Sequence, residues 1–297
     1  MNKMKKSCIL CNNKSFSIFS SYVRDSKNHK VVKCKKCNHI QLFPIPNLDD
    51  EKKFYDENLQ DKNINDVGSI KRAHKKMIDD TKRRIELVSK ITPKHGAILE
   101  IGSGHGFFLE MMRKKGFKML RIEISKEKRK ISKKITRVKI LDININEQNT
   151  NSGLFDTIVF FHVLEHMTEP VKFLINCQKL LKPKGRIIIE VPNANDFQIH
   201  LNKAYKEFYW QRAHISYFTP KILQKILQKS GLKNNKIFGV QRYSIENMFN
   251  WKLTNKPQID EPTYNLPKFY SWIESHYKKN LEESQKCDTI ISISQYS

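Results

Sequence analysis

A regular alternation of strand-like and helix-like segments, running from Gly96 to the end of the chain, is the feature that most restricts the fold. Short apolar runs rich in Ile, Val and Phe are separated there by amphipathic stretches. Buried strands that alternate with helices are typical of a parallel sheet with helices on both faces. We therefore expect a doubly wound α/β fold with strands at 97–101, 118–124, 138–143, 156–161, 186–191, 236–243 and 288–294.

A glycine-rich turn follows the first of these strands, in the sequence Glu100-Ile-Gly102-Ser103-Gly104-His-Gly106. Residues without a Cβ let the chain reverse tightly and let the backbone approach a ligand closely. The same spacing is also compatible with a strand-to-helix turn that binds nothing. Because Phe107 stands where a dinucleotide fingerprint has its third glycine, a pyrophosphate ligand is disfavoured.

Acidic residues end three consecutive predicted strands, at Glu100, Glu123 and Asp142. The carboxyl ends of parallel strands meet at one edge of a sheet, where carboxylates can accept hydrogen bonds from ribose hydroxyls and an adenine amino group. Each acid taken singly could instead cap a helix or face solvent. Together with the glycine turn, the three acids predict a pocket for a cationic adenosyl ligand.

Two cysteine pairs near the start of the chain, Cys8-x2-Cys11 and Cys34-x2-Cys37, form a second motif. Four thiolates in two knuckles suit tetrahedral Zn²⁺, and a site with four protein ligands is structural because no coordination position stays open. Residues 1–46 are too few for a self-sufficient core, so a bound metal would stabilise them. We expect a zinc-ribbon-like module there, with two disulfides or free thiols as the alternative.

The composition narrows the class of protein further. The chain has 55 basic and 30 acidic residues, but 44 of the basic residues are Lys and 11 are Arg. Phosphate recognition favours Arg, so we attribute most of the net charge of +25 to solvated surface. A mean hydropathy of −0.60, without any apolar run of about 18 residues, argues against a membrane span. Because no apolar signal-peptide core follows Met1, we expect a reduced, cytoplasmic protein.

The segment 96–193 resembles the class I S-adenosylmethionine-dependent methyltransferases. Its glycine turn matches their first motif, Glu123 their ribose-binding acid and Asp142 their adenine-side acid, while the tract 180–190 leads into a fifth strand as theirs does. The resemblance implies a Rossmann-like sheet of seven strands and methyl transfer from S-adenosylmethionine. It also implies a set of cofactor contacts, namely Glu100, Gly102, Ser103, Gly104, Glu123, Ile124, Asp142, Ile143 and Phe161.

The cysteine module, the Pro44-Ile-Pro46 segment after it, and the later segment His214-Ile-Ser-Tyr-Phe-Thr-Pro resemble bacterial methyltransferases with an N-terminal zinc-binding domain. That group includes sugar C-methyltransferases and enzymes associated with surface-polysaccharide synthesis. The resemblance implies structural zinc and, as acceptor, a sugar, nucleotide sugar or surface-polysaccharide precursor. It leaves open whether O, N or C is methylated. We expect the module at 1–46, a helical connector at 47–95, and the cofactor domain at 96–297 with an aromatic-rich insertion at 244–286.

Candidate catalytic residues are His162, Glu165, His166 and His214. The first three share one face if their segment is helical, and a neutral imidazole suits a general base. Glu165 could orient either neighbouring histidine, the three could bind a divalent cation as in the similar E-x-x-E-H pattern of quinone O-methyltransferases, or the segment could be an ordered turn. His214 lies among aromatic residues that either stack on the acceptor or cover the core, namely Phe208, Tyr209, Trp210, Tyr217 and Phe218.

Two other functions stay open. Some ribosomal RNA guanine methyltransferases also join a cysteine zinc ribbon to this fold, and the basic charge would suit RNA. Against RNA, the fourth predicted strand lacks the N-P-P-Y signature of base-amine methylation and the Pro-Cys of cytosine C5 chemistry. A non-catalytic scaffold is the other alternative, and the retained Glu100, Gly102, Gly104, Glu123 and Asp142 argue against it.

Overall fold

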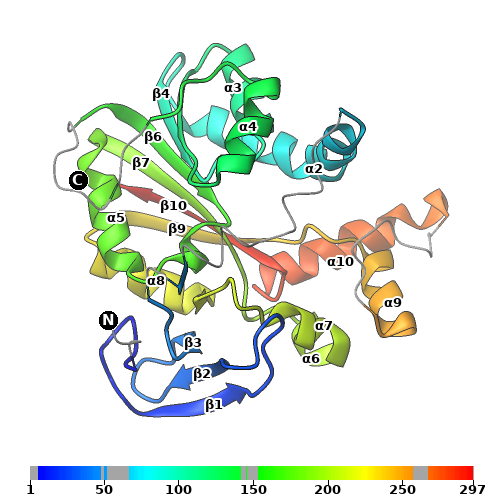
Figure 1. The fold of residues 1–297 in the computed structure, drawn as a ribbon. Helices are drawn as coiled ribbons and strands as arrows, with labels where there is room; N and C mark the ends of the chain where they lie inside the picture. Colours follow the sequence, from blue (N-terminus) through cyan, green and yellow to red (C-terminus); the bar gives the residue numbers. More distant parts are fainter. Residues whose placement is uncertain are drawn as a thin grey trace.

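The computed structural model describes residues 6–47, 50–51, 67–141, 145, 153–256 and 267–296. Within these residues, a large sheet is flanked by helices, and a small sheet lies beside it at the N-terminal end of the chain (Figure 1). The two sheets share no strand.

Among the described residues, six strands form the large sheet in the order β5-β4-β6-β7-β10-β9. Their bounds, in chain order, are Ala97–Ile101 (β4), Lys118–Ile122 (β5), Phe155–Phe161 (β6), Leu181–Pro192 (β7), Lys233–Val240 (β9) and Thr289–Gln295 (β10). The strands β5, β4, β6 and β7 are parallel, as the sequence predicts.

The last strand, β10, runs antiparallel to both β7 and β9, so the expectation of a wholly parallel sheet is wrong there. Thr289, the first residue of β10, lies opposite Val240, the last residue of β9. β9 therefore ends, and β10 begins, at the same end of the strands, so the two strands run in opposite directions.

The predicted strand at 138–143 is described only in part. Ile140 forms an isolated parallel bridge with Arg121, and the N–H of Leu141 donates to the carbonyl oxygen of Arg121 at 2.8 Å. Asp142 and Ile143 lie outside the described residues. The expectation of a seventh strand therefore stays a prediction.

Side chains of the central strands alternate between two apolar layers, which confirms a sheet covered on both faces. Leu99, Ile158 and Ile187 pack on the side of α5 and α8, whereas Ile98, Val159 and Ile188 pack on the side of α2 and α3. Figure 1 shows α2, α3 and α4 on one side of the sheet and α5 and α8 on the other. These helices span Val67–Ile91 (α2), Phe107–Lys114 (α3), Lys126–Ile135 (α4), Pro170–Lys179 (α5) and Pro220–Lys229 (α8).

The small sheet has the order β1-β2-β3-β8, and each neighbouring pair is antiparallel. Its first three strands come from the N-terminal region, but β8 comes from the chain just before α8. Its apolar side chains share a core with α7 and α9. The bounds are Phe16–Ser20 (β1), Lys30–Cys34 (β2), Ile40–Phe43 (β3) and Ser216–Tyr217 (β8).

Shorter elements connect the layers. A 3-10 turn, η2, follows β6, and the helices α6 and α7 follow β7. The described residues between β9 and β10 include α9, η3 and α10. These elements span Leu164–His166 (η2), Gln198–Leu201 (α6), Lys203–Tyr209 (α7), Ile245–Thr254 (α9), Lys268–Tyr270 (η3) and Ser271–Glu283 (α10). In the described part of the chain, every helix is too short or too polar to cross a membrane.

Candidate active site

The glycine turn connects β4 to α3 at the carboxyl edge of the sheet. Gly102, Gly104 and Gly106 have φ angles of 72°, 52° and 86°, in the left-handed region that favours glycine. A Cβ on Gly102 would lie 2.5 Å from Cγ2 of Val163, whereas a Cβ on Gly104 would meet no described atom within 4 Å. The turn is therefore packed against the segment after β6 on one side and open at Gly104.

Glu123 lies beside this turn, as the sequence predicts. One carboxylate oxygen accepts the N–H of Gly104 at 2.7 Å, and the other accepts the N–H of Ser125 at 2.9 Å. The carboxylate is buried and holds the glycine turn against the start of α4.

Glu100 is the second acid at this edge. It is buried, and its Oε2 has no hydrogen-bond partner among the described residues. Burial, with a further contribution from the Glu123 carboxylate, raises the pKa of Glu100 to about 8 against the opposing charges of Arg84 and Arg121. Ser103 Oγ is likewise buried without a partner in the described structure. A buried acceptor and hydroxyl beside an open glycine fit a cationic adenosyl ligand with hydrogen-bonding groups.

The other residues proposed to contact a cofactor are spread around this edge. Ile124 is 71% exposed and follows β5, whereas Phe161 is buried against Phe108, with the Arg84 guanidinium 4.5 Å from its ring centre. Asp142 and Ile143 are outside the described residues.

Two carboxylates flank His162, the first residue after β6. Its Nδ1 lies 3.4 Å from Oε1 of Glu165, and its Nε2 lies 3.3 Å from Oε1 of Glu190. Burial opposes protonation of this imidazole, and so does the charge of Arg242, but the two carboxylates outweigh both and raise the pKa of His162. His162 has a left-handed φ of 56°, a conformation that is unusual for a residue with a Cβ. The two carboxylates therefore make this imidazole easier to protonate, whereas the Arg242 guanidinium, with Nη1 at 3.3 Å from Nε2, opposes protonation.

Glu165, His166 and His214 come together on the other side of the same segment. Their potential ligand atoms all lie within 4.8 Å of one another, and the His166 and His214 ring centres are 5.1 Å apart. His166 Nδ1 donates to the carbonyl oxygen of Ala213 at 2.7 Å, so Nε2 is the atom that carries the lone pair when the imidazole is neutral. That Nε2 lies 4.0 Å from Oε1 of Glu165.

His214 is less suited to accept a proton. Burial, with the nearby His166, lowers the pKa of His214 to about 3, and the Gln211 amide nitrogen lies 2.9 Å from its Nε2. The same Glu165, His166 and His214 side chains have the donor types of a divalent-cation site, and Oε2 of Glu165 has no hydrogen-bond partner in the described structure.

The aromatic residues around His214 cover the core and are not free to stack on an acceptor. Tyr209, Trp210 and Tyr217 are buried against one another in the small-sheet core, Phe218 is buried in the main core, and the Arg24 guanidinium lies 3.9 Å from the Phe208 ring centre. Of the two interpretations left open by the sequence, the structure supports the packing one.

Sequence reasoning missed the ion pairs behind His162. Glu190, at the end of β7, is fully buried and binds the guanidinium groups of Arg83 and Arg84, with Arg83 Nη2 at 3.0 Å from Oε2. Arg242 pairs with Asp288 at 2.6 Å. Glu190 carries the same signal as Glu100, an acid at the end of an apolar strand, and that signal could have identified it.

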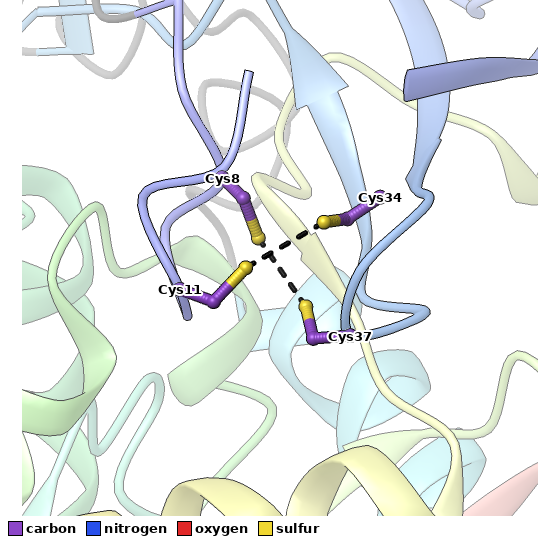
Figure 2. A group of neighbouring side chains, drawn as sticks. All are labelled: Cys8, Cys11, Cys34 and Cys37. Carbon is purple, nitrogen blue, oxygen red and sulfur yellow. Dashed lines mark hydrogen bonds between the residues drawn. The ribbon is translucent and has the colours of Figure 1, made fainter. Parts of the chain in front are cut away.

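The four N-terminal cysteines converge as the spacing predicts. Figure 2 shows their sulfur atoms pointing toward one another, with Sγ–Sγ distances of 3.5 Å for Cys8–Cys37 and 3.6 Å for Cys11–Cys34. All four thiols are free, and these distances are far beyond the disulfide bond length of about 2.05 Å. They are close to the sulfur separation of about 3.8 Å implied by Zn–S bonds of about 2.3 Å in a tetrahedron. The donor set therefore fits a zinc ion.

Comparisons with known proteins identify relatives of this chain. A family model described as Methyltransferase domain matches residues 71–237. The ubiquinone biosynthesis O-methyltransferase of Coxiella burnetii is 24% identical over 197 residues, which cover 62% of this chain and 82% of that protein.

Solved structures also share the fold, among them the following two. An S-adenosylmethionine-dependent methyltransferase from Archaeoglobus fulgidus has a TM-score of 0.51 at 20% identity and covers 73% of this chain and 93% of its own. Haemonchus contortus phosphoethanolamine N-methyltransferase 2, solved with S-adenosyl-L-methionine, has a TM-score of 0.53 at 15% identity and covers 86% of this chain and 62% of its own.

Proposed function

We propose, from the premise that the chain belongs to the methyltransferase domain family and is an S-adenosylmethionine-dependent methyltransferase, that it methylates a hydroxyl group of a small molecule. The observation that carries this proposal is His166, whose Nδ1 donates to the Ala213 carbonyl and whose Nε2 lies 4.0 Å from Oε1 of Glu165. A positioned neutral imidazole is what deprotonation of a hydroxyl requires.

The cofactor would lie at the edge formed by the glycine turn. When bound, S-adenosylmethionine supplies a sulfonium methyl group that is open to in-line displacement. Glu100 offers an unpartnered buried carboxyl to the positively charged end, Glu123 a carboxylate to the ribose, and Gly104 a backbone without a Cβ. From the family resemblance, we assign the adenine side to Asp142.

His166 and Glu165 would then act on the acceptor. Nε2 of His166 would accept the hydroxyl proton as the acceptor oxygen takes the methyl group that the cofactor would supply. The Glu165 carboxylate, 4.0 Å away, stabilises the imidazolium that forms. Burial alone would raise the pKa of Glu165, but His162 and the neighbouring histidines lower it to about 2, so the carboxylate stays charged.

The acceptor class follows from the sequence resemblance and the relatives. The cysteine-module resemblance favours a sugar, nucleotide sugar or surface-polysaccharide precursor, and the Coxiella burnetii relative is named for O-methylation in ubiquinone biosynthesis. Both are small hydroxyl-bearing acceptors, and a small acceptor is favoured over RNA.

We assign structural zinc to the four cysteines. Cys8, Cys11, Cys34 and Cys37 supply all four ligands, so the ion would have no position for a substrate. Its role would be to hold the two knuckles together.

The direct test is S-adenosylmethionine consumption with panels of nucleotide sugars, catechols and total RNA. Turnover with a hydroxyl acceptor that is insensitive to added salt supports the proposal. Turnover with RNA alone, falling steeply with salt, would replace it with the RNA alternative. Calorimetry without heat of S-adenosylmethionine binding would exclude both.

A further inference from the structure

Gln41 connects the cysteine cluster to the rest of the molecule. Its side chain is fully buried, its Oε1 accepts the N–H of Ile9 at 2.9 Å, and its Nε2 donates to the carbonyl of Ser7 at 3.3 Å. Ser7 and Ile9 flank Cys8, so this amide holds the first cysteine knuckle. The Gln41 backbone, in contrast, pairs with Ser216 of β8.

The segment 210–217 is bonded to the small sheet by its backbone. The N–H of Leu42 donates to Ile215 at 2.9 Å, the N–H of Arg24 donates to Trp210 at 2.7 Å, and the N–H of Arg212 donates back to Arg24 at 3.2 Å. These bonds join residues that are more than 170 positions apart in the chain.

The other side of the same segment is bonded to Glu165 and His166, which with His214 form the acceptor half of the candidate site. The N–H of Ile215 donates to the backbone carbonyl of Glu165 at 2.8 Å, and the carbonyl of Ala213 accepts the His166 Nδ1 proton at 2.7 Å. His214 itself lies between these two contacts. A displacement of this segment would therefore remove the group that orients His166.

We propose that the metal-bound cysteine module positions the acceptor half of the active site, and that Gln41 is the positioning residue that transmits this support through β8. This inference rests on the proposed function in one respect only, namely that Glu165, His166 and His214 act on the acceptor. It assigns the module an internal role, since its strand edge at β3 is occupied by β8 of the same chain. Among the described residues, the glycine turn and Glu123 form no hydrogen bond with the module, and we expect them to keep their structure without it.

Hydrogen exchange on the full-length protein tests this proposal without an acceptor. The zinc-loaded protein is compared with protein treated with EDTA and with Gln41→Met, which keeps the side-chain length but removes both amide contacts. We expect exchange in peptides from 210–217 to accelerate by about tenfold or more in both cases, with peptides from 98–106 unchanged. Affinity for S-adenosylmethionine, measured by calorimetry, should stay the same, and excess Zn²⁺ should restore protection in the EDTA-treated wild type but not in Gln41→Met.

Gln178→Met is the matched control. Gln178 is also a buried glutamine whose amide donates to a backbone carbonyl, that of Ser230 at 2.7 Å, but it lies on the main domain. It should not accelerate exchange at 210–217. Unchanged exchange at 210–217 after zinc removal would overturn the proposal, and so would equal acceleration at 98–106. If no acceptor is ever methylated, the proposed function fails while the exchange result still stands.

Discussion

Gly102 and Val163 pack so closely that a Cβ on Gly102 would lie 2.5 Å from Cγ2 of Val163. The turn on the cofactor side and the segment that carries Glu165 and His166 therefore have a fixed separation. A reaction that needs a methyl group and a base in line depends on such a fixed separation. The lack of a side chain at 102 is thus a packing requirement as well as a conformational one.

Gly104 has a different requirement, which a substitution can isolate. Gly104→Ala should bind S-adenosylmethionine at least about tenfold more weakly, because the added Cβ occupies the space where the cofactor would approach the backbone. Gly231→Ala is the control, since Gly231 also has a positive φ, 82°, and would meet no described atom within 4 Å. Both should lose about 1–2 kcal/mol of stability from backbone strain, measured by urea unfolding. Equal cofactor affinity in the two variants would contradict the assignment of this turn.

Glu100 should make cofactor affinity depend on pH. Its pKa of about 8 in the free protein means that the carboxyl is protonated at pH 6, and binding a cation requires the carboxylate. Affinity should therefore rise with pH between about 6 and 7.5, by up to about tenfold per pH unit. Calorimetry over this range checks the slope. Glu100→Gln should bind weakly with a flat profile, and a variant that keeps the wild-type slope would assign the titration to another group.

The two acids beside the glycine turn could be predicted because their signal is local. Glu100 and Glu123 each end an apolar strand, and the carboxyl ends of parallel strands share one edge. The direction of β10 could not be predicted in this way. Its side chains alternate with a period of two residues in either direction, so the apolar pattern carries no information about polarity.

On the acceptor side, the sequence predicted the individual candidate residues but not the contacts between them. The sequence singles out His166 by its spacing from His162 and Glu165, and His214 by its aromatic neighbours. The contact between the two histidines depends on β8 joining the small sheet, a pairing of two residues with no periodic pattern. Glu190 was missed although it ends a strand, because its partners Arg83 and Arg84 lie on a helix more than a hundred residues earlier. Contacts between segments that are distant in the sequence can be identified only once the fold is known.

Glu190 should be essential for stability. Glu190→Gln would leave Arg83 and Arg84 without their buried carboxylate, and we expect a loss of about 3–5 kcal/mol in urea unfolding at pH 7. Burial alone would raise the pKa of Glu190, but Arg84, His162 and Arg83 outweigh it and hold this pKa well below the usual value. The stabilisation is therefore present above the usual carboxyl pKa and is lost as pH falls below it. The difference between wild type and variant should shrink at pH 4.

Glu86→Gln provides the comparison for this effect. Glu86 forms an exposed ion pair with Lys90 on α2, and its loss should barely change stability. If Glu86→Gln lowered the free energy of unfolding as much as Glu190→Gln, the buried ion pairs of Glu190 would contribute no more to stability than an exposed pair.

The cysteine cluster should bind one zinc ion per chain. Metal analysis of protein expressed with Zn²⁺ should give this ratio, and Cys37→Ser should lower it strongly because three thiolates hold zinc less well than four. Cys177→Ser, which changes a buried cysteine outside the cluster, should leave the ratio unchanged. A second equivalent that disappears in His166→Ala would show that Glu165, His166 and His214 also bind a cation.

His166 should be required for turnover but not for cofactor binding. His166→Ala removes the imidazole that the Ala213 carbonyl orients and that we propose as the base, so turnover should fall by about 10² to 10⁴. Affinity for S-adenosylmethionine should be unchanged, because the glycine turn contacts Val163 rather than His166. His214→Gln should cost less, since the Gln211 amide already occupies its Nε2. His276→Ala is the control, since it removes an exposed imidazole on α10 and should leave turnover unchanged. If His166→Ala lost cofactor affinity along with turnover, His166 would be a structural residue, and the hydroxyl proton would have to leave by another route.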